Sequence, residues 1–250
     1  MTAEIKTSTQ TVGIVIPAFN EATNLHRVLN VACDTPWLSK IIVVDDGSDD
    51  DTLAVAERYA LIDQRVLALR SPKNQGKAAA MYFGIRALQT DTVIFLDADL
   101  INLKPYHLWQ LYHPVELGMY DMTIAVFQHG RFLTDVSHRL TPNLSGQRCL
   151  SRSVAETILE SLSDSRYGVE IGLTIFAKRQ KWHIKKIAWH GITHLTKEQK
   201  QHGLAGIYHR RQMYGEILST WASAQKQTML PVSSIDRQQI PRVSWGMFRR

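Results

Sequence analysis

Two aspartates directly after a short apolar run are the residues of this sequence whose spacing points most clearly to chemistry. Asp97 and Asp99 follow the run Val93 to Leu96, which is typical of a buried strand. Two carboxylates two residues apart at a strand end can reach one divalent cation together, and hard oxygen ligands suit Mg²⁺ or Mn²⁺. Such an ion bridges diphosphate oxygens and offsets charge on a leaving nucleoside diphosphate. The pair, with Ala98 between its members, predicts a metal and diphosphate site.

The elements before this pair would bring more polar groups to the same place. Apolar runs predict strands, and the stretches between them have helical spacing, which together favour a parallel α/β sheet with strands buried on both faces. Ligands of such sheets lie outside the carboxyl ends of the strands. We therefore expect the groups Asn20-Glu21, Asp45-Asp46 and Asp97-Asp99 to converge. The expected strands are 12–16, 41–44, 65–69 and 92–96, and the expected helices are 22–32, 52–61 and 76–88.

The second half of the chain is less regular. Its patterns predict helices at 106–117, 154–162, 169–178 and 207–221, strands at 122–127 and 183–189, and a loop at 128–147. From Pro231 onward the periodicity fades. We expect one domain over residues 1–230, with a nucleotide-sugar half at 12–100, an acceptor half at 101–230, and a tail at 231–250.

Four segments carry a specific pattern over roughly residues 12–100. They are, in chain order, Val15-Ile16-Pro17-Ala18-Phe19-Asn20-Glu21, Val43-Val44-Asp45-Asp46-Gly47-Ser48, Asn74-Gln75-Gly76-Lys77-Ala78 and Asp97-Ala98-Asp99. Together they resemble family-2 glycosyltransferases of the GT-A fold. The resemblance implies an α/β nucleotide-binding sandwich with a mostly parallel central sheet. It also implies an enzyme that takes a sugar from a UDP- or GDP-sugar donor, with Mg²⁺ or Mn²⁺ as cofactor.

The same resemblance implies roles for individual residues. Pro17, Ala18 and Glu21 would line the nucleoside pocket, and Asp46 would hydrogen-bond the base. Lys77 would serve the base or diphosphate. The residue chemistry agrees, because Glu21 and Asp46 supply acceptors and a helix N-terminus favours an anion. The donor-binding residues we expect are Pro17, Ala18, Asn20, Glu21, Asp46, Gly47, Ser48, Gly76, Lys77, Asp97 and Ala98, and Asp99 would be the main metal ligand and a catalytic residue.

Two segments of the second half resemble glucosyl-3-phosphoglycerate synthases and their bacterial relatives. Tyr167-Gly168-Val169-Glu170-Ile171-Gly172 suggests that Glu170 contacts the sugar or acceptor as a catalytic residue; a helix N-terminal charge is the alternative. Ser145-Gly146-Gln147-Arg148 resembles the acceptor loop, which would place Gly146 and Arg148 against substrate. Gln147 stands where an acidic residue is more usual, so a base role at that position is in doubt.

Histidines and basic residues follow the strand expected at 183–189. In relatives a histidine after this strand completes the metal site, and we favour His194 over His190, with a structural histidine as the alternative. A basic run could bind an acceptor phosphate or lipid headgroups, although a solvated helix face explains it equally well. The run consists of Lys197, Lys200, Arg210 and Arg211.

Composition and motifs exclude several other classes. The turn after the first strand lacks the glycines of a dinucleotide site, and Ser71 stands where a phosphate-binding P-loop needs glycine. A net charge of +6 does not single out nucleic acid, and we expect none as a partner. Cys33 and Cys149 lack metal spacing and predict reduced thiols in the cytoplasm, and the polar start predicts no signal peptide. Peripheral membrane contact and a homodimer stay open.

Two alternative functions stay in view. A nucleotidyltransferase that makes nucleotide-sugars would use a related sheet, but the glycine-rich, Arg-containing loop of such enzymes is missing after the first strand. A catalytically silent nucleotide-binding protein would not need both Asp97 and Asp99. The sequence therefore favours a metal-dependent glycosyltransferase whose acceptor bears a phosphate, either a small molecule or a lipid.

Overall fold

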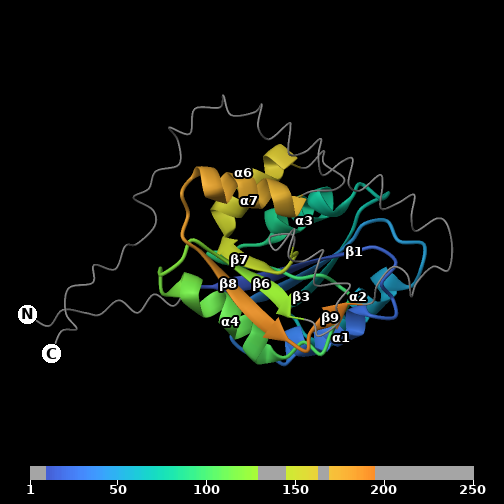
Figure 1. The fold of residues 1–250 in the computed structure, drawn as a ribbon. Helices are drawn as coiled ribbons and strands as arrows, with labels where there is room; N and C mark the ends of the chain where they lie inside the picture. The colour runs from blue at the N-terminus through green and yellow to red at the C-terminus, as the bar shows by residue number, and fades with distance from the viewer. Residues whose placement is uncertain (1–9, 129–144, 163–168, 195–250) are drawn as a thin grey trace, which may run out of the picture.

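A seven-stranded sheet lies at the centre of the computed structural model, which describes residues 10–128, 145–162 and 169–194 (Figure 1). Its strand order is β3-β2-β1-β4-β7-β6-β8. Strands β1 to β4 are parallel, β7 runs antiparallel to both β4 and β6, and β6 is parallel to β8. The expected mostly parallel sheet is confirmed. The strands are β1 Val12–Ala18, β2 Lys40–Asp45, β3 Val66–Arg70, β4 Thr92–Phe95, β6 Met122–Gln128, β7 Arg148–Ser151 and β8 Ile184–His190.

Helices cover both faces of this sheet. Helices α1, α2 and α4 lie on one face, and α3, α6 and α7 lie on the other (Figure 1). Strand β1 explains why, because Ile14 and Ile16 join the first apolar core while Val15 joins the second. A strand that is apolar at successive positions must be buried on both faces. The helices are α1 Leu25–Cys33, α2 Thr52–Ile62, α3 Lys77–Ala87, α4 Pro105–Glu116, α6 Arg152–Leu162 and α7 Val169–Arg179.

The chain order of the parallel strands fixes where a ligand can bind. The sheet runs outward from β1 through β2 to β3 in one direction and from β1 to β4 in the other. The crossover direction therefore reverses between β1 and β4. Open α/β sheets bind ligands outside the carboxyl ends of the strands at such a switch point. The aspartates after β4 lie at the carboxyl end of that strand, beside this switch point.

A two-stranded sheet begins directly after these aspartates. Strand β5, Leu100–Ile101, pairs antiparallel with β9, Thr193–His194. Leu100 lies opposite His194 and Ile101 opposite Thr193. This pairing joins the segment after the aspartates to the segment after β8.

Most expected elements are present with shifted ends, and two expectations are corrected. The helix expected from Ala22 begins at Leu25, because the backbone N–H groups of Asn24 and Leu25 both bond the Glu21 carbonyl and form a turn first. Strand β7, which no pattern predicted, begins directly after the loop expected at 128–147. The helix expected at 207–221, the tail at 231–250 and most of that loop lie outside the described residues.

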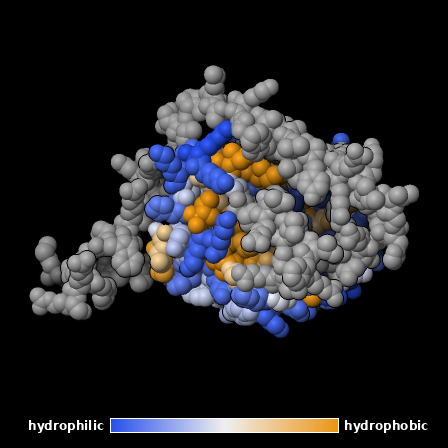
Figure 2. Space-filling view, viewed as in Figure 1, coloured by the Kyte–Doolittle hydropathy of each residue, from blue (hydrophilic) through white to orange (hydrophobic). Residues whose placement is uncertain are grey.

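Strand β8 is the last strand in the order of the sheet, and it carries both exposed and buried side chains. Lys185 and Lys186 are exposed, whereas Ile187 and Trp189 are buried. In the space-filling view, hydrophilic and apolar areas alternate over the described part of this face (Figure 2). From Lys186 to His190 exposed and buried residues alternate, since successive side chains of a strand point to opposite faces.

Candidate active site

The loop after β1 is fastened to the loop after β2. The backbone N–H of Asn20 donates to Ser48 Oγ at 2.9 Å, and the Asn20 side-chain oxygen accepts the Asp49 N–H at 3.0 Å. The N–H of Glu21 donates to Thr52 Oγ1 at 2.8 Å. Asn20 has a φ of 55°, a left-handed conformation that asparagine tolerates better than most residues. The first two groups of expected donor residues therefore lie side by side.

The buried Asp46 holds the loop that precedes α3. Its two carboxylate oxygens accept the N–H groups of Gln75 and Gly76 at 2.9 and 2.8 Å. Gly47, with a φ of +71°, permits this approach, because a Cβ there would lie 2.6–2.8 Å from the backbone of Lys73 and Asn74. Charge-assisted bonds of this kind are among the stronger ones in proteins. Asp46 thus fixes the backbone of the loop before α3. Its contact with a base stays a prediction.

Lys77 joins two carboxylates that come from distant segments. Its Nζ lies 2.6 Å from Asp97 Oδ1 and 2.6 Å from Glu170 Oε1. Burial disfavours the charged lysine, but attraction from Asp97 and Glu170 outweighs it and raises the pKa of Lys77 above its usual value. Lys77 is therefore a fixed positive charge where α3, the end of β4 and the start of α7 meet. The structure brings two residues that the sequence assigned to the donor together with one that it assigned to the sugar or acceptor.

The segment before β7 packs against the same carboxylate. Gly146 lies so close that a Cβ would meet the Asp97 oxygens at 2.6 and 2.8 Å and Lys77 Nζ at 2.7 Å. Gln147 Nε2 donates to Asp97 Oδ2 at 2.6 Å. The sequence pattern indicated no positive role for Gln147. The only signal was that an amide stands where an acid is usual.

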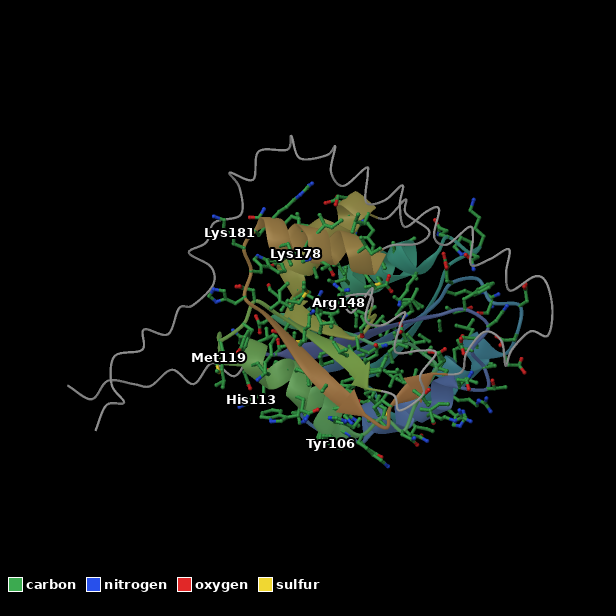
Figure 3. All side chains as sticks on the ribbon, in the orientation of Figure 1. Tyr106, His113, Met119, Arg148, Lys178 and Lys181 are labelled. Atoms are coloured by element: carbon green, nitrogen blue, oxygen red, sulfur yellow. The ribbon has the colours of Figure 1, made fainter. Side chains whose placement is uncertain are left out.

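Arg148 lies beneath the site rather than on its surface. The side chain is fully buried between the sheet and the helices above it (Figure 3). Its Nε donates to the Ser145 carbonyl at 2.9 Å and its Nη1 to Thr174 Oγ1 at 3.0 Å. Burial lowers the pKa of Arg148 to about 10, against the opposing attraction of Glu170 and Asp97. A contact with an acceptor phosphate stays a prediction, and the visible role is to hold β7 against α7.

Asp99 and His194 are brought near each other by the small sheet. Asp99 immediately precedes Leu100, which pairs with His194. His190 instead ends β8 opposite Gln128. The choice of His194 over His190 as a metal ligand stays a prediction.

The donor set at the end of β4 fits a hard divalent cation. Asp97 and Asp99 offer carboxylate oxygens, which Mg²⁺ and Mn²⁺ prefer. Within the described residues, no group of three or more His, Cys, Asp and Glu side chains forms a complete metal site. Mg²⁺ sites that bind nucleotides commonly use one or two carboxylates and take further oxygens from substrate phosphates. The two aspartates therefore suit a metal that arrives with a diphosphate.

The other predicted binding residues lie close by or outside the described ranges. Pro17 is half-buried and Ala18 is buried at the end of β1. The basic residues Lys197, Lys200, Arg210 and Arg211 lie outside the part of the chain that the structure describes. Among the described helices, none is both long and apolar enough to cross a membrane.

Comparison with known proteins identifies the fold. Glucosyl-3-phosphoglycerate synthase from Mycobacterium tuberculosis, solved with Mn²⁺, uridine diphosphate and glucosyl-3-phosphoglycerate, superposes with a TM-score of 0.62 at 24% identity. The match covers 86% of this chain and 80% of that one. The GT-A-type sandwich expected from the sequence is thereby confirmed.

Curated relatives match shorter parts of the chain. Glycosyltransferase AglD of Haloferax volcanii is 33% identical over 116 residues, which cover 44% of this chain and 18% of the relative. Undecaprenyl-phosphate 4-deoxy-4-formamido-L-arabinose transferase of Pseudomonas fluorescens is 34% identical over 170 residues, which cover 60% and 48%. These matches span about half or less of the relatives' length. The family model described as "Glycosyl transferase family 2" matches residues 13–157. With more than half of its length matched, the chain belongs to glycosyl transferase family 2.

Proposed function

We propose that this protein transfers a glycosyl group from a nucleotide-diphosphate-sugar to a phosphate-bearing acceptor, with Mg²⁺ or Mn²⁺. The observation that carries the proposal is the contact of Lys77 with both Asp97 and Glu170 at the carboxyl edge of the sheet. A cation beside a strand-end carboxylate is suited to a diphosphate and its metal. A second carboxylate on the facing helix is suited to the sugar or acceptor.

The donor nucleoside would bind over the joined loops after β1 and β2. Glu21 and Asp46 offer oxygens for ribose hydroxyls and a base N–H, since carboxylate oxygens can accept more than one hydrogen bond. We favour uridine over guanosine. The solved relative that binds uridine diphosphate has the same fold, which supports this choice.

Asp97, Asp99 and His194 would hold the metal. When bound, a divalent ion supplies charge stabilisation to the departing diphosphate. Lys77 would add a second positive charge on the same side, and the N-terminal N–H groups of α3 would favour the anion as well. Glu170 would contact the sugar or the attacking group. Whether the anomeric configuration is inverted or retained stays open.

The acceptor would bear a phosphate. Relatives include a transferase named for undecaprenyl phosphate and a synthase crystallised with phosphoglyceric acid, so a lipid and a small acid are both represented. The basic residues Lys197, Lys200, Arg210 and Arg211 would attract this phosphate, and the buried Arg148 would add positive charge beneath the site. Charge reversal at Lys197 and Lys200 should then raise the acceptor KM and leave donor affinity unchanged. An unchanged acceptor KM in a folded variant would remove the phosphate-acceptor proposal.

We place the reaction in the cytoplasm, with a lipid acceptor reached from the cytoplasmic face of the membrane if one is used. Binding to vesicles that contain a polyprenyl phosphate, compared with vesicles without it, tests that placement. A homodimer is tested separately by measuring mass in solution.

The decisive experiment is sugar release and transfer from a panel of UDP- and GDP-sugars, with Mn²⁺ or with excess EDTA. We expect EDTA and Asp99→Asn to abolish turnover. The matched control is Asp34→Asn, an exposed aspartate at the end of α1, which should leave turnover unchanged. Undiminished activity in EDTA would refute the metal assignment. Pyrophosphate release from a nucleoside triphosphate and a sugar phosphate would indicate a nucleotidyltransferase, and nucleotide binding without turnover would indicate a silent protein.

A further inference from the structure

Gln147 lies between Ser145 and Asp97 and is fully buried. Its Nε2 donates to Asp97 Oδ2 at 2.6 Å, and its Oε1 accepts from Ser145 Oγ at 2.8 Å. The other Asp97 oxygen, Oδ1, accepts from Lys77 Nζ at 2.6 Å. Each oxygen of the Asp97 carboxylate is therefore held by a different donor from a different segment.

We infer that Gln147 is a positioning residue that sets the orientation of Asp97 for the metal and diphosphate. The inference rests on the proposed function, because it takes Asp97 to be part of that site. The terminal torsion of an aspartate is broad, so a carboxylate at a strand end has no intrinsic preferred plane. Donors on both oxygens fix that plane, and each oxygen keeps lone-pair capacity for a metal.

The amide suits this position better than an acid would. A carboxylate in place of the Gln147 amide would put a second negative charge against Asp97, and the two could sit so close only by sharing a proton. The amide donates a hydrogen bond and adds no charge. Ser145 fixes the direction of the amide, because its hydroxyl donates to Oε1 and leaves Nε2 facing Asp97.

Gly146 allows the backbone to bring this amide close. With no Cβ, the segment from Ser145 to Gln147 approaches Asp97 and Lys77 more closely than another residue would permit. Gln147 has no basic nitrogen, so it acts on the reaction through Asp97 rather than as a proton acceptor. Ligand-orienting partners of this kind typically contribute about 10–100-fold to metal affinity.

The test measures Mn²⁺ affinity in the presence of UDP, by electron paramagnetic resonance, for a double-mutant cycle. The variants are Gln147→Leu, Asp97→Asn and the two combined, and Ser145→Ala is a milder second probe. Gln110→Leu is the matched control, because Gln110 is exposed on α4. Urea unfolding in metal-free buffer shows that each variant is folded.

We expect Gln147→Leu to weaken Mn²⁺–UDP binding by about 10–100-fold. Ser145→Ala should weaken it by a smaller factor, and Gln110→Leu should leave it unchanged. The combined variant should bind no more weakly than Asp97→Asn alone, because residues that act through one another are not additive. A residue needed only for packing would lower the unfolding midpoint and leave the affinity of the folded protein unchanged.

Two results would overturn the inference while leaving the proposed function in place. One is weaker Mn²⁺–UDP binding in Asp97→Asn together with unchanged binding in both Gln147→Leu and Ser145→Ala. The other is full additivity of Gln147→Leu and Asp97→Asn. Failure of the proposed function looks different, because the wild-type protein would then bind UDP without any dependence on Mn²⁺, or Asp97→Asn would bind both normally.

Discussion

Replacing Lys77 by methionine would test whether one ammonium group holds the two halves of the site together. The substitution keeps a long apolar stem and removes the charge that contacts Asp97 and Glu170, each at 2.6 Å. Two carboxylates would then lie close together without that counter-charge. We expect the variant to be less stable and to bind a nucleotide diphosphate more weakly.

The magnitude follows from the burial of the three side chains. Their exposed fractions are 31% for Lys77, 23% for Asp97 and 16% for Glu170. Removing one partner of a fully buried ion pair costs about 3–5 kcal/mol, and partial exposure reduces this, so we expect a loss of about 2 kcal/mol. For a domain of this size that corresponds to a fall in Tm of about 4–8 °C.

The pH dependence gives a sharper signature. Because the folded pKa of Lys77 is raised, its stabilising contribution is fully present below the unfolded lysine pKa of about 10.4 and is lost as the pH rises through the folded value. The stability difference between wild type and Lys77→Met should therefore be constant from pH 7 to about pH 10 and shrink only above that. Urea unfolding across this range measures it.

Lys73→Met is the matched control. Lys73 is exposed in the loop before α3, and its replacement removes the same formal charge. A difference of less than about 0.5 kcal/mol between the two variants at pH 7 would refute the ion-pair argument, because exposed charges contribute about this much.

Three further substitutions or treatments follow from the structure. Asp46→Ala removes the acceptor of two backbone N–H groups and should lower the free energy of unfolding by about 1–3 kcal/mol, measured in urea, and weaken UDP binding. Gly146→Ala adds a methyl group against the Asp97 carboxylate and the Lys77 ammonium, so both must shift and their ion pair is disturbed. Mn²⁺–UDP affinity should fall about tenfold or more, and the free energy of unfolding should fall by about 1–3 kcal/mol. Burial raises the pKa of Cys149 well above its usual value, so a thiol reagent at pH 8 should leave it unmodified in the native protein and label it after unfolding.

The first half of the fold was predictable because its patterns are strong and local. The strands expected at 12–16 and 41–44 are apolar at successive positions and stop at Pro17 and Asp45. Strand β1 runs two residues further at its carboxyl end, and β2 runs one residue further at each end. Strand β7 could not be predicted in this way. It has four residues and begins with a charged one. It pairs with β4 and β6, and Arg148 finds Ser145 and Thr174 as partners only in the folded protein. The short strands β5 and β9 pair segments that no local pattern connects.

The candidate site also combines residues that local patterns predicted with one that depends on a distant contact. The sequence assigned Asp97 and Lys77 to the donor and Glu170 to the sugar or acceptor. The structure brings the three into contact although Lys77 and Glu170 are 93 positions apart. The role of Gln147 escaped prediction because an amide has no chemistry of its own to suggest one. Its role depends on the acceptor of its Nε2 hydrogen bond, and that acceptor belongs to Asp97, 50 positions away.

The contacts of Asp97 also explain why donor and acceptor halves should not behave independently. Asp97 follows a strand of the half proposed to bind the nucleotide, and Glu170 lies in the first turn of a helix of the half proposed to bind the acceptor, yet one ammonium group touches both. A metal that binds Asp97 brings positive charge next to Lys77, and like charges repel more strongly in a partly buried site than in water. Lys77 must then rely more on Glu170 or move towards a diphosphate. Either response changes the surroundings of Glu170. Donor binding would therefore change the affinity for the acceptor, which is expected to bind there.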